Sequence, residues 1–194
     1  MRKLLGTALL ALMAAGPVPA AELSIAGGGG LYLPVQQAFR DVYGTAALFS
    51  LDVRWLATRN LGFSAGALTL SRRGTAVSQD GGTEALGVKL RLTSVPLAAF
   101  WHIPRGRLGI DLGAGLAYHD FEETWADEGG PADSGAKWGL LAYASVAYKL
   151  TPRLSVVGTW RYLDIPTGRK SLLTDKVNLG GFQVLVGASW TFVR

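Results

Sequence analysis

Apolar and polar residues alternate along most of this chain, and the alternation is cleanest near the C-terminus. Every second residue from Phe182 to Phe192 is apolar, while the residues between them are mostly small or polar. A period of two is typical of a β-strand with one apolar face. Because a tilted strand of about ten residues crosses a bilayer, this run predicts a lipid-facing membrane strand.

Seven similar runs precede it, so the pattern predicts eight strands, over residues 22–33, 45–56, 61–72, 84–102, 108–121, 136–150, 154–165 and 177–194. Short turns follow the second, fourth and sixth strands, and longer loops follow the others, including a loop over residues 34–43. Short periplasmic turns, long external loops and an even strand number are typical of membrane barrels. The sequence therefore predicts an all-β fold, an eight-stranded antiparallel up-and-down transmembrane β-barrel in which the last strand pairs with the first.

One residue interrupts this pattern. Pro96 lies inside the fourth predicted strand, and proline cannot donate a backbone hydrogen bond to a neighbouring strand. We expect a bulge or a local break near residues 95–97, or an orientation in which that bond is not needed.

The N-terminus predicts export. Arg2 and Lys3 precede a short apolar run, and small residues lead to Ala20, which is the pattern of a secretory signal peptide over residues 1–20. The remainder, residues 21–194, forms one barrel domain. Apolar residues make up 49% of the chain and charged residues 17%, which suits strands that face lipid.

Charge excludes one class of partner. Loss of Arg2 and Lys3 with the signal peptide lowers the formal net charge from +5 to +3. This charge is dispersed, so no nucleic-acid partner is expected.

Polar residues of the strands are expected to point into the barrel. The candidates for a polar network in the lumen are Asp52, Arg54, Lys89, Arg91, Asp111, Lys149, Arg161 and Gln183. Eight strands leave an interior barely wide enough for side chains, so these groups should fill it and neutralise one another. The alternative is that the cationic excess admits small anions or holds lipopolysaccharide phosphates near the rim.

The main candidate for a catalytic or metal-binding residue is His119, which is close in sequence to Glu122 and Glu123. A hydrolase needs a nucleophile, a base and an orienting acid, and no serine is close in sequence, although Ser71 or Ser171 could approach in space. The spacing of the acids and the histidine matches no recognised metal-ligand motif. No catalytic residue, metal or cofactor is therefore expected, and His119 remains the alternative site.

Two motifs carry a resemblance to a known family. The closing Gly187-x-x-Trp190-x-Phe192 and the strand residues 112–118 resemble the small outer-membrane barrels of Gram-negative bacteria, the OmpA-like, OmpX-like and opacity-type proteins. The resemblance implies that Gly187, Trp190 and Phe192 are interface anchors and a signal for the barrel-assembly machinery, although the chain continues beyond the aromatic residue. It also implies a monomer in the outer membrane, in contact with lipid and lipopolysaccharide.

Three functions follow from this resemblance. The first expectation is a non-enzymatic protein with an envelope or surface-interaction role and at most limited passage of small solutes. The second is a lipid A modifying enzyme, since barrels of this kind include a deacylase and a palmitoyl transferase, although the deacylase has a serine two residues after its histidine where this chain has Phe121. The third is a channel for small hydrophobic compounds, as in OmpW-like barrels.

Overall fold

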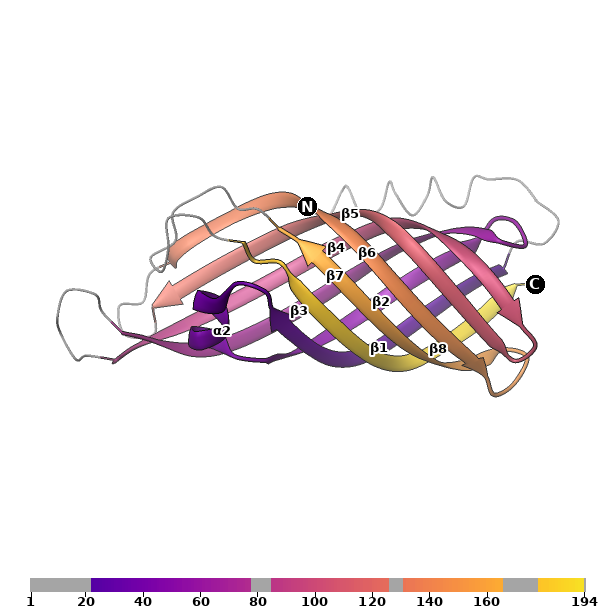
Figure 1. Ribbon diagram of the computed structural model, residues 1–194, viewed down its shortest axis with the longest axis horizontal. Coiled ribbons are helices and arrows are strands. Elements are labelled where there is room, and N and C mark those ends of the chain that lie inside the picture. Colours follow the sequence, from indigo (N-terminus) through magenta and orange to yellow (C-terminus); the bar gives the residue numbers. More distant parts are fainter. Residues whose placement is uncertain (1–21, 78–84, 126–130, 166–177, 194) are drawn as a thin grey trace.

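The computed structural model describes residues 22–77, 85–125, 131–165 and 178–193. These residues form a closed antiparallel barrel with a short helix at one end (Figure 1). The elements are β1 (Glu22–Pro34), α2 (Gln37–Tyr43), β2 (Ala46–Leu56), β3 (Leu61–Val77), β4 (Ala85–Arg105), β5 (Leu108–Trp125), β6 (Pro131–Lys149), β7 (Leu154–Asp164) and β8 (Gly181–Val193). Each strand pairs with its neighbours in sequence, and β8 pairs with β1. The predicted fold class is confirmed, while the predicted signal peptide lies outside the described residues.

The barrel has two different ends. Short connections after β2, β4 and β6 lie at one end, which we call the turn end, and α2 lies at the other, which we call the helix end (Figure 1). The described part of the chain has no helix long and apolar enough to cross a membrane. Strands β3 to β6 have 17 to 21 residues and the others 11 to 13, so β3 to β6 continue further toward the helix end.

The helix corrects the expected loop over residues 34–43. Phe39 and Tyr43 are one helical turn apart, stack with ring centroids 5.5 Å apart, and are both buried. Gly44 follows with a φ of 59°, a left-handed conformation that commonly ends helices and favours glycine. The alternation of the neighbouring strands gave no indication of this short helix of seven residues.

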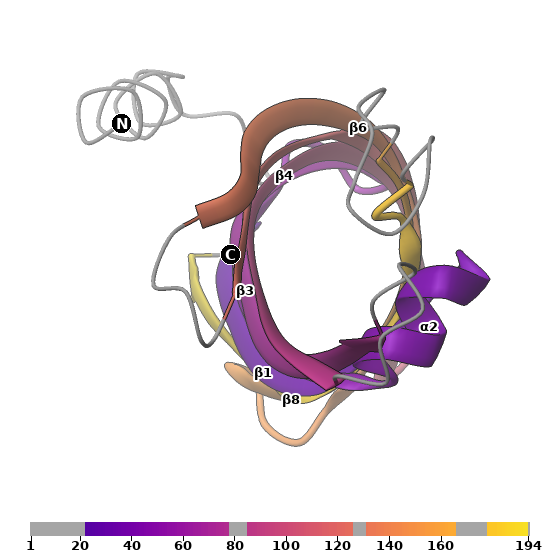
Figure 2. The ribbon, with the colours of Figure 1, turned by 90° about the vertical axis from the view of Figure 1, so that its left-hand side faces the viewer.

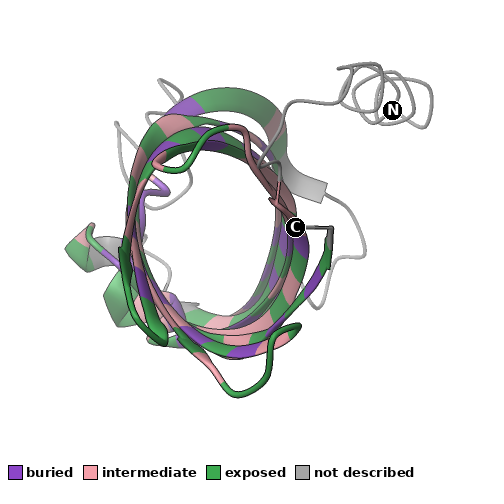
Figure 3. Ribbon diagram, turned by 90° about the vertical axis from the view of Figure 1, so that its right-hand side faces the viewer, coloured by how far each residue is buried: buried purple, intermediate pink, exposed green. Residues whose placement is uncertain are grey.

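Side chains alternate between the lumen and the outer surface, as the pattern predicts. Figure 3 shows buried and exposed residues succeeding one another along the strands. Large apolar side chains cover the outside on every strand, including Ile25, Phe49, Phe63, Trp101, Leu112, Trp138, Trp160 and Val186. The barrel therefore turns an apolar surface outward, which is the arrangement that a bilayer requires.

Pro96 leaves a local break in the pairing between two strands. The pairs between β3 and β4 pass from Ala65 with Leu97 to Leu68 with Ser94, without pairs between them and without a change of register. On its other side, Pro96 pairs with Ala117 of β5. A proline tolerates this position because its missing N–H coincides with the break.

Candidate functional site

Charged side chains cross the lumen toward the turn end. The Arg54 guanidinium donates to one oxygen of Asp111, and His102 Nδ1 donates to the other at 2.6 Å. Nearby, Arg161 Nη2 donates to Asp52 Oδ2 at 2.6 Å. These five residues come from β2, β4, β5 and β7, and we call them the ionic floor. The floor links opposite parts of the barrel wall.

The charges of the floor are compensated although they are withdrawn from water. The Asp111 side chain is 1% exposed and the Arg54 side chain 16%, and the guanidinium also lies 5.0 Å from the centroid of the Phe100 ring. Burial of a charge is unfavourable unless an opposite charge and hydrogen bonds compensate it. Two acids face two arginines here, so the floor is close to neutral.

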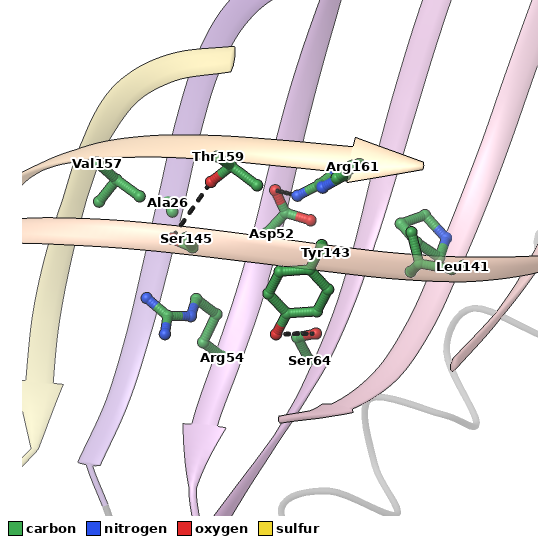
Figure 4. Close-up of a pocket in the computed structure, with 11 residues that line it drawn as sticks. Ala26, Asp52, Arg54, Ser64, Leu141, Tyr143, Ser145, Val157, Thr159 and Arg161 are labelled. Atoms are coloured by element: carbon green, nitrogen blue, oxygen red, sulfur yellow. Dashed lines mark hydrogen bonds and ion pairs between the residues drawn. The ribbon is translucent and has the colours of Figure 1, made fainter. Parts of the chain in front are cut away.

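A cavity of about 30 Å³ lies beside the floor, with room for about two water molecules. Figure 4 shows the side chains of Asp52, Tyr143 and Arg161 pointing into it, together with small hydroxyl residues. Arg161 Nη1 is buried and has no protein partner among the described residues. The arrangement suits bound water.

Glycines make this crowded interior possible. Gly113 pairs with Tyr143 across β5 and β6, and a Cβ at Gly113 would overlap the tyrosine ring. A Cβ at Gly66 would likewise overlap the Asp52 carboxylate.

Toward the helix end most buried side chains of the lumen are apolar, although Ser94, His119, Glu123 and Gln183 are buried among them. This apolar tier comprises Leu48, Leu68, Leu70, Val88, Leu90, Leu92, Phe121, Leu141, Leu163, Ile165 and Leu185. All are buried, and they come from β2 to β8 and from the residue after β7. The lumen therefore has two parts, an ionic floor and an apolar tier above it.

The helix end of the tier is partly covered by residues that follow the loop before β8. The Tyr32 hydroxyl donates to Leu179 O at 2.5 Å. Asn178 Nδ2 donates to Asp164 Oδ1 at 2.7 Å, and Asn178 Oδ1 accepts from Gly180 N at 2.7 Å. These bonds fix residues 178–180 across the end of β7.

Helix α2 lies beside this segment on the same rim (Figure 2), where Asn178 N donates at 2.7 Å to Oε1 of Gln36, the residue before the helix. The Tyr43 hydroxyl donates to Glu123 Oε1, and Tyr43 O accepts from Arg72 Nε at 3.0 Å. Burial raises the pKa of the Tyr43 phenol, and the Glu123 carboxylate adds to the rise. The phenol therefore remains a hydrogen-bond donor under physiological conditions.

His119 has a hydroxyl partner, which is Ser94 and not the exposed Ser71, while Ser171 lies outside the described residues. Ser94 pairs with His119 in the register of β4 and β5, and its Oγ lies 2.6 Å from His119 Nδ1. The imidazole is fully buried in the lumen, and its Nε2 has no hydrogen-bond partner in the described part of the chain. The pair has a candidate nucleophile and base, but none of the described acids orients the imidazole at its second nitrogen.

A shared metal site at His119, Glu122 and Glu123 does not form. Glu122 is exposed, whereas Glu123 is buried and bound to Tyr43. Successive strand residues point to opposite faces, so the two acids separate. Among the described residues, no group of three His, Asp or Glu could hold a metal ion.

The predicted polar network is partly wrong. Asp52, Arg54, Asp111 and Arg161 meet in the ionic floor, while Gln183 is buried in the lumen without a side-chain partner in the described part of the chain. Lys149 is half-buried at the turn end. Lys89 and Arg91 are exposed on the outer surface, because the buried positions of this part of β4 are Val88, Leu90 and Leu92.

The predicted anchors lie on β8 near the turn end. Trp190 and Phe192 are both exposed on the outer wall, and Gly187 lies against the backbone of Gly27 and Gly28 of β1, where a Cβ would collide. Gly187 thus permits close pairing at the closing seam. The role of these residues as an assembly signal stays a prediction.

Comparisons with known proteins agree with this geometry. The family described as outer membrane protein beta-barrel domain matches residues 8–192. The structure of the outer membrane protein OprG from Pseudomonas aeruginosa is similar with a TM-score of 0.72 at 16% identity, over 90% of this chain and 97% of that one. A major outer membrane protein from Thermus thermophilus gives a TM-score of 0.62 at 16% identity, over 89% and 100% of the two chains.

The E. coli outer membrane protein W is also similar, with a TM-score of 0.56 at 19% identity, over 89% of this chain and 98% of that one. No curated protein matches the sequence. Since the family match covers nearly the whole chain and the fold is a closed eight-stranded barrel, the chain belongs to the outer membrane protein beta-barrel domain family.

Proposed function

We propose that this outer-membrane barrel is a non-catalytic protein that takes small apolar molecules from outside into its apolar tier and excludes ions. The apolar lining of half the lumen carries the proposal. Short turns of membrane barrels face the periplasm, so the helix end and the apolar tier face outward. Of the three expected functions, passage of small hydrophobic compounds fits this lining best.

The tier offers a medium that apolar molecules prefer to water. Its side chains are mostly leucines, and transfer of apolar surface from water to such surroundings is favoured by roughly 25 cal/mol per Å². The side chains fill the lumen, so a ligand enters by displacing leucine rotamers. An ion gains no favourable transfer free energy among these apolar side chains, and the ionic floor lies beyond them.

The ionic floor directs an apolar molecule away from the lumen axis. Passage through it would separate Arg161 from Asp52 and Arg54 from Asp111 without replacing their bonds. Pro96 lines the floor cavity at the break between β3 and β4, and Leu97 beside it is exposed on the outer wall. This break is the proposed exit, from the lumen sideways into the bilayer.

Photolabelling tests the proposal. The barrel is reconstituted in nanodiscs and exposed to phenyl(trifluoromethyl)diazirine with and without excess naphthalene, and labelled residues are located by mass spectrometry. We expect label on the lumen residues Leu70 and Leu92 that naphthalene suppresses, because the tier has a limited capacity. Label on the outer residues Leu97 and Leu112 should persist, because it reflects partition into lipid.

Matched variants of one strand make the test specific. Leu92→Asn, which places an amide in the tier, should abolish the suppressible label, while Leu97→Asn on the outer wall should leave it unchanged. Both variants are first checked for the compact band that folded barrels show on unheated gels. Label restricted to outer residues in the wild-type barrel would contradict the proposal.

A further inference from the structure

Three cations gather on the outer wall of β3 and β4 near the helix end. Arg73 pairs directly with Lys89 in the register of the two strands, and Arg91 pairs with Ser71. All three cationic side chains are exposed, whereas Leu70, Leu90 and Leu92 on the alternate positions are buried in the lumen. We call Arg73, Lys89 and Arg91 the wall cluster.

No side chain of the wall cluster forms an ion pair within the described part of the chain. Like charges directly opposite each other on two strands are unfavourable, yet Arg73 faces Lys89. Glu122 of β5 is the register partner of Arg91, but the ion pairs of the described residues are those of the ionic floor and involve none of the wall cluster. An external anion would relieve this repulsion.

The position of the wall cluster relative to the bilayer identifies that anion. Tyr118 and Trp138 form an outward-facing edge-to-face pair on β5 and β6, 5.4 Å between centroids, as expected of an aromatic band at the membrane interface. Val95 pairs with Tyr118, and Arg91 lies four residues beyond Val95 toward the helix end. At about 3.3 Å per residue along a tilted strand, Arg91 stands about 10 Å outside the aromatic band, within reach of lipid headgroups.

We propose that Arg73, Lys89 and Arg91 bind the phosphate groups of a phosphorylated glycolipid of the outer leaflet, the lipid A portion of lipopolysaccharide. Guanidinium groups bind phosphate oxygens in pairs of charge-assisted hydrogen bonds, and an ammonium adds a mobile point charge. The site is independent of the proposed function, because it lies on the opposite face of the wall from the apolar tier.

Binding of purified diphosphoryl lipid A to the detergent-solubilised barrel, counted by native mass spectrometry, tests this site. The cluster variant is Arg73→Gln/Lys89→Gln/Arg91→Gln, and the matched control is Arg59→Gln/Arg105→Gln/Arg153→Gln, which removes three exposed cations at the turn end. At about fivefold per cation near a membrane surface, the cluster variant should bind about a hundredfold more weakly than wild type. The control should bind as wild type does.

Two further ligands distinguish the source of the phosphate. Dephosphorylated lipid A should bind wild type no better than the cluster variant, and inorganic phosphate should compete only at far higher concentration. Equal binding by wild type and cluster variant, equal loss in the control, or undiminished binding of the dephosphorylated lipid would each overturn the proposal. If the triple variant does not fold, Lys89→Gln alone should still bind about fivefold more weakly, and an unchanged affinity would count against the site.

Discussion

Replacement of Asp111 by alanine is expected to lower the free energy of unfolding by about 3–5 kcal/mol. Asp111 is 1% exposed and accepts bonds from both Arg54 and His102. Its loss leaves the Arg54 charge inside the barrel without an ionic partner. Denaturant unfolding of the barrel in micelles, followed by tryptophan fluorescence, measures the change.

Two comparisons separate this charge effect from a general loss of packing. Arg59→Ala removes an exposed charge at a turn and should change the unfolding free energy by less than about 0.5 kcal/mol. Adding Arg54→Met to Asp111→Ala removes the unpaired charge and should restore part of the stability. If Asp111→Ala lowered the free energy of unfolding no more than Arg59→Ala does, the ionic floor would not stabilise the barrel as we expect.

Replacement of Val186 by arginine is expected to destabilise the barrel by about 2–4 kcal/mol. Val186 is 63% exposed near the middle of β8. At an exposed position in water the same change would be within about 0.5 kcal/mol. The difference arises because the arginine must be placed in hydrocarbon, and reversible unfolding from lipid vesicles measures it.

A second arginine substitution provides the reference for this measurement. Thr75 is exposed on β3, beyond the wall cluster toward the helix end, where headgroups and water replace hydrocarbon. Thr75→Arg should cost at most about 1 kcal/mol. Equal effects of the two substitutions would mean that the middle of β8 does not face lipid.

The alternation of apolar and polar residues was sufficient to predict the barrel, because the two faces of each strand lie in different environments on the two sides of the wall. Most strand starts agree closely with the structure, as at Leu61, Leu108 and Leu154. The short helix α2 was missed, because seven residues between two strands are too few to establish a helical period.

The error at Lys89 and Arg91 has a physical cause. Within the membrane, charged residues of a barrel strand belong inside and apolar residues outside. Beyond the membrane this arrangement is reversed, with charged residues outside and apolar residues inside, since water or headgroups lie outside and the lumen of this barrel is mostly apolar. Alternation along β4 continues across that boundary, so it gives the two faces but does not say which one is inside.

The partner of His119 could have been found by counting from a turn. Arg105 pairs with Leu108 across the short turn, and equal steps along both strands bring Ser94 opposite His119. By contrast, the meeting of Asp52 with Arg161 depends on closure of the whole barrel, because β2 and β7 are not neighbours. Such contacts across the lumen cannot be read from neighbouring strands.

Closure of the lumen to ions by an apolar tier above an ionic floor is the central claim of the proposed function. Single-channel recording of the wild-type barrel in a planar bilayer tests this claim most directly. The floor pairs and the buried leucines predict no steady conductance above that of the protein-free bilayer. Steady, large conductance steps, as a water-filled pore produces, would contradict it.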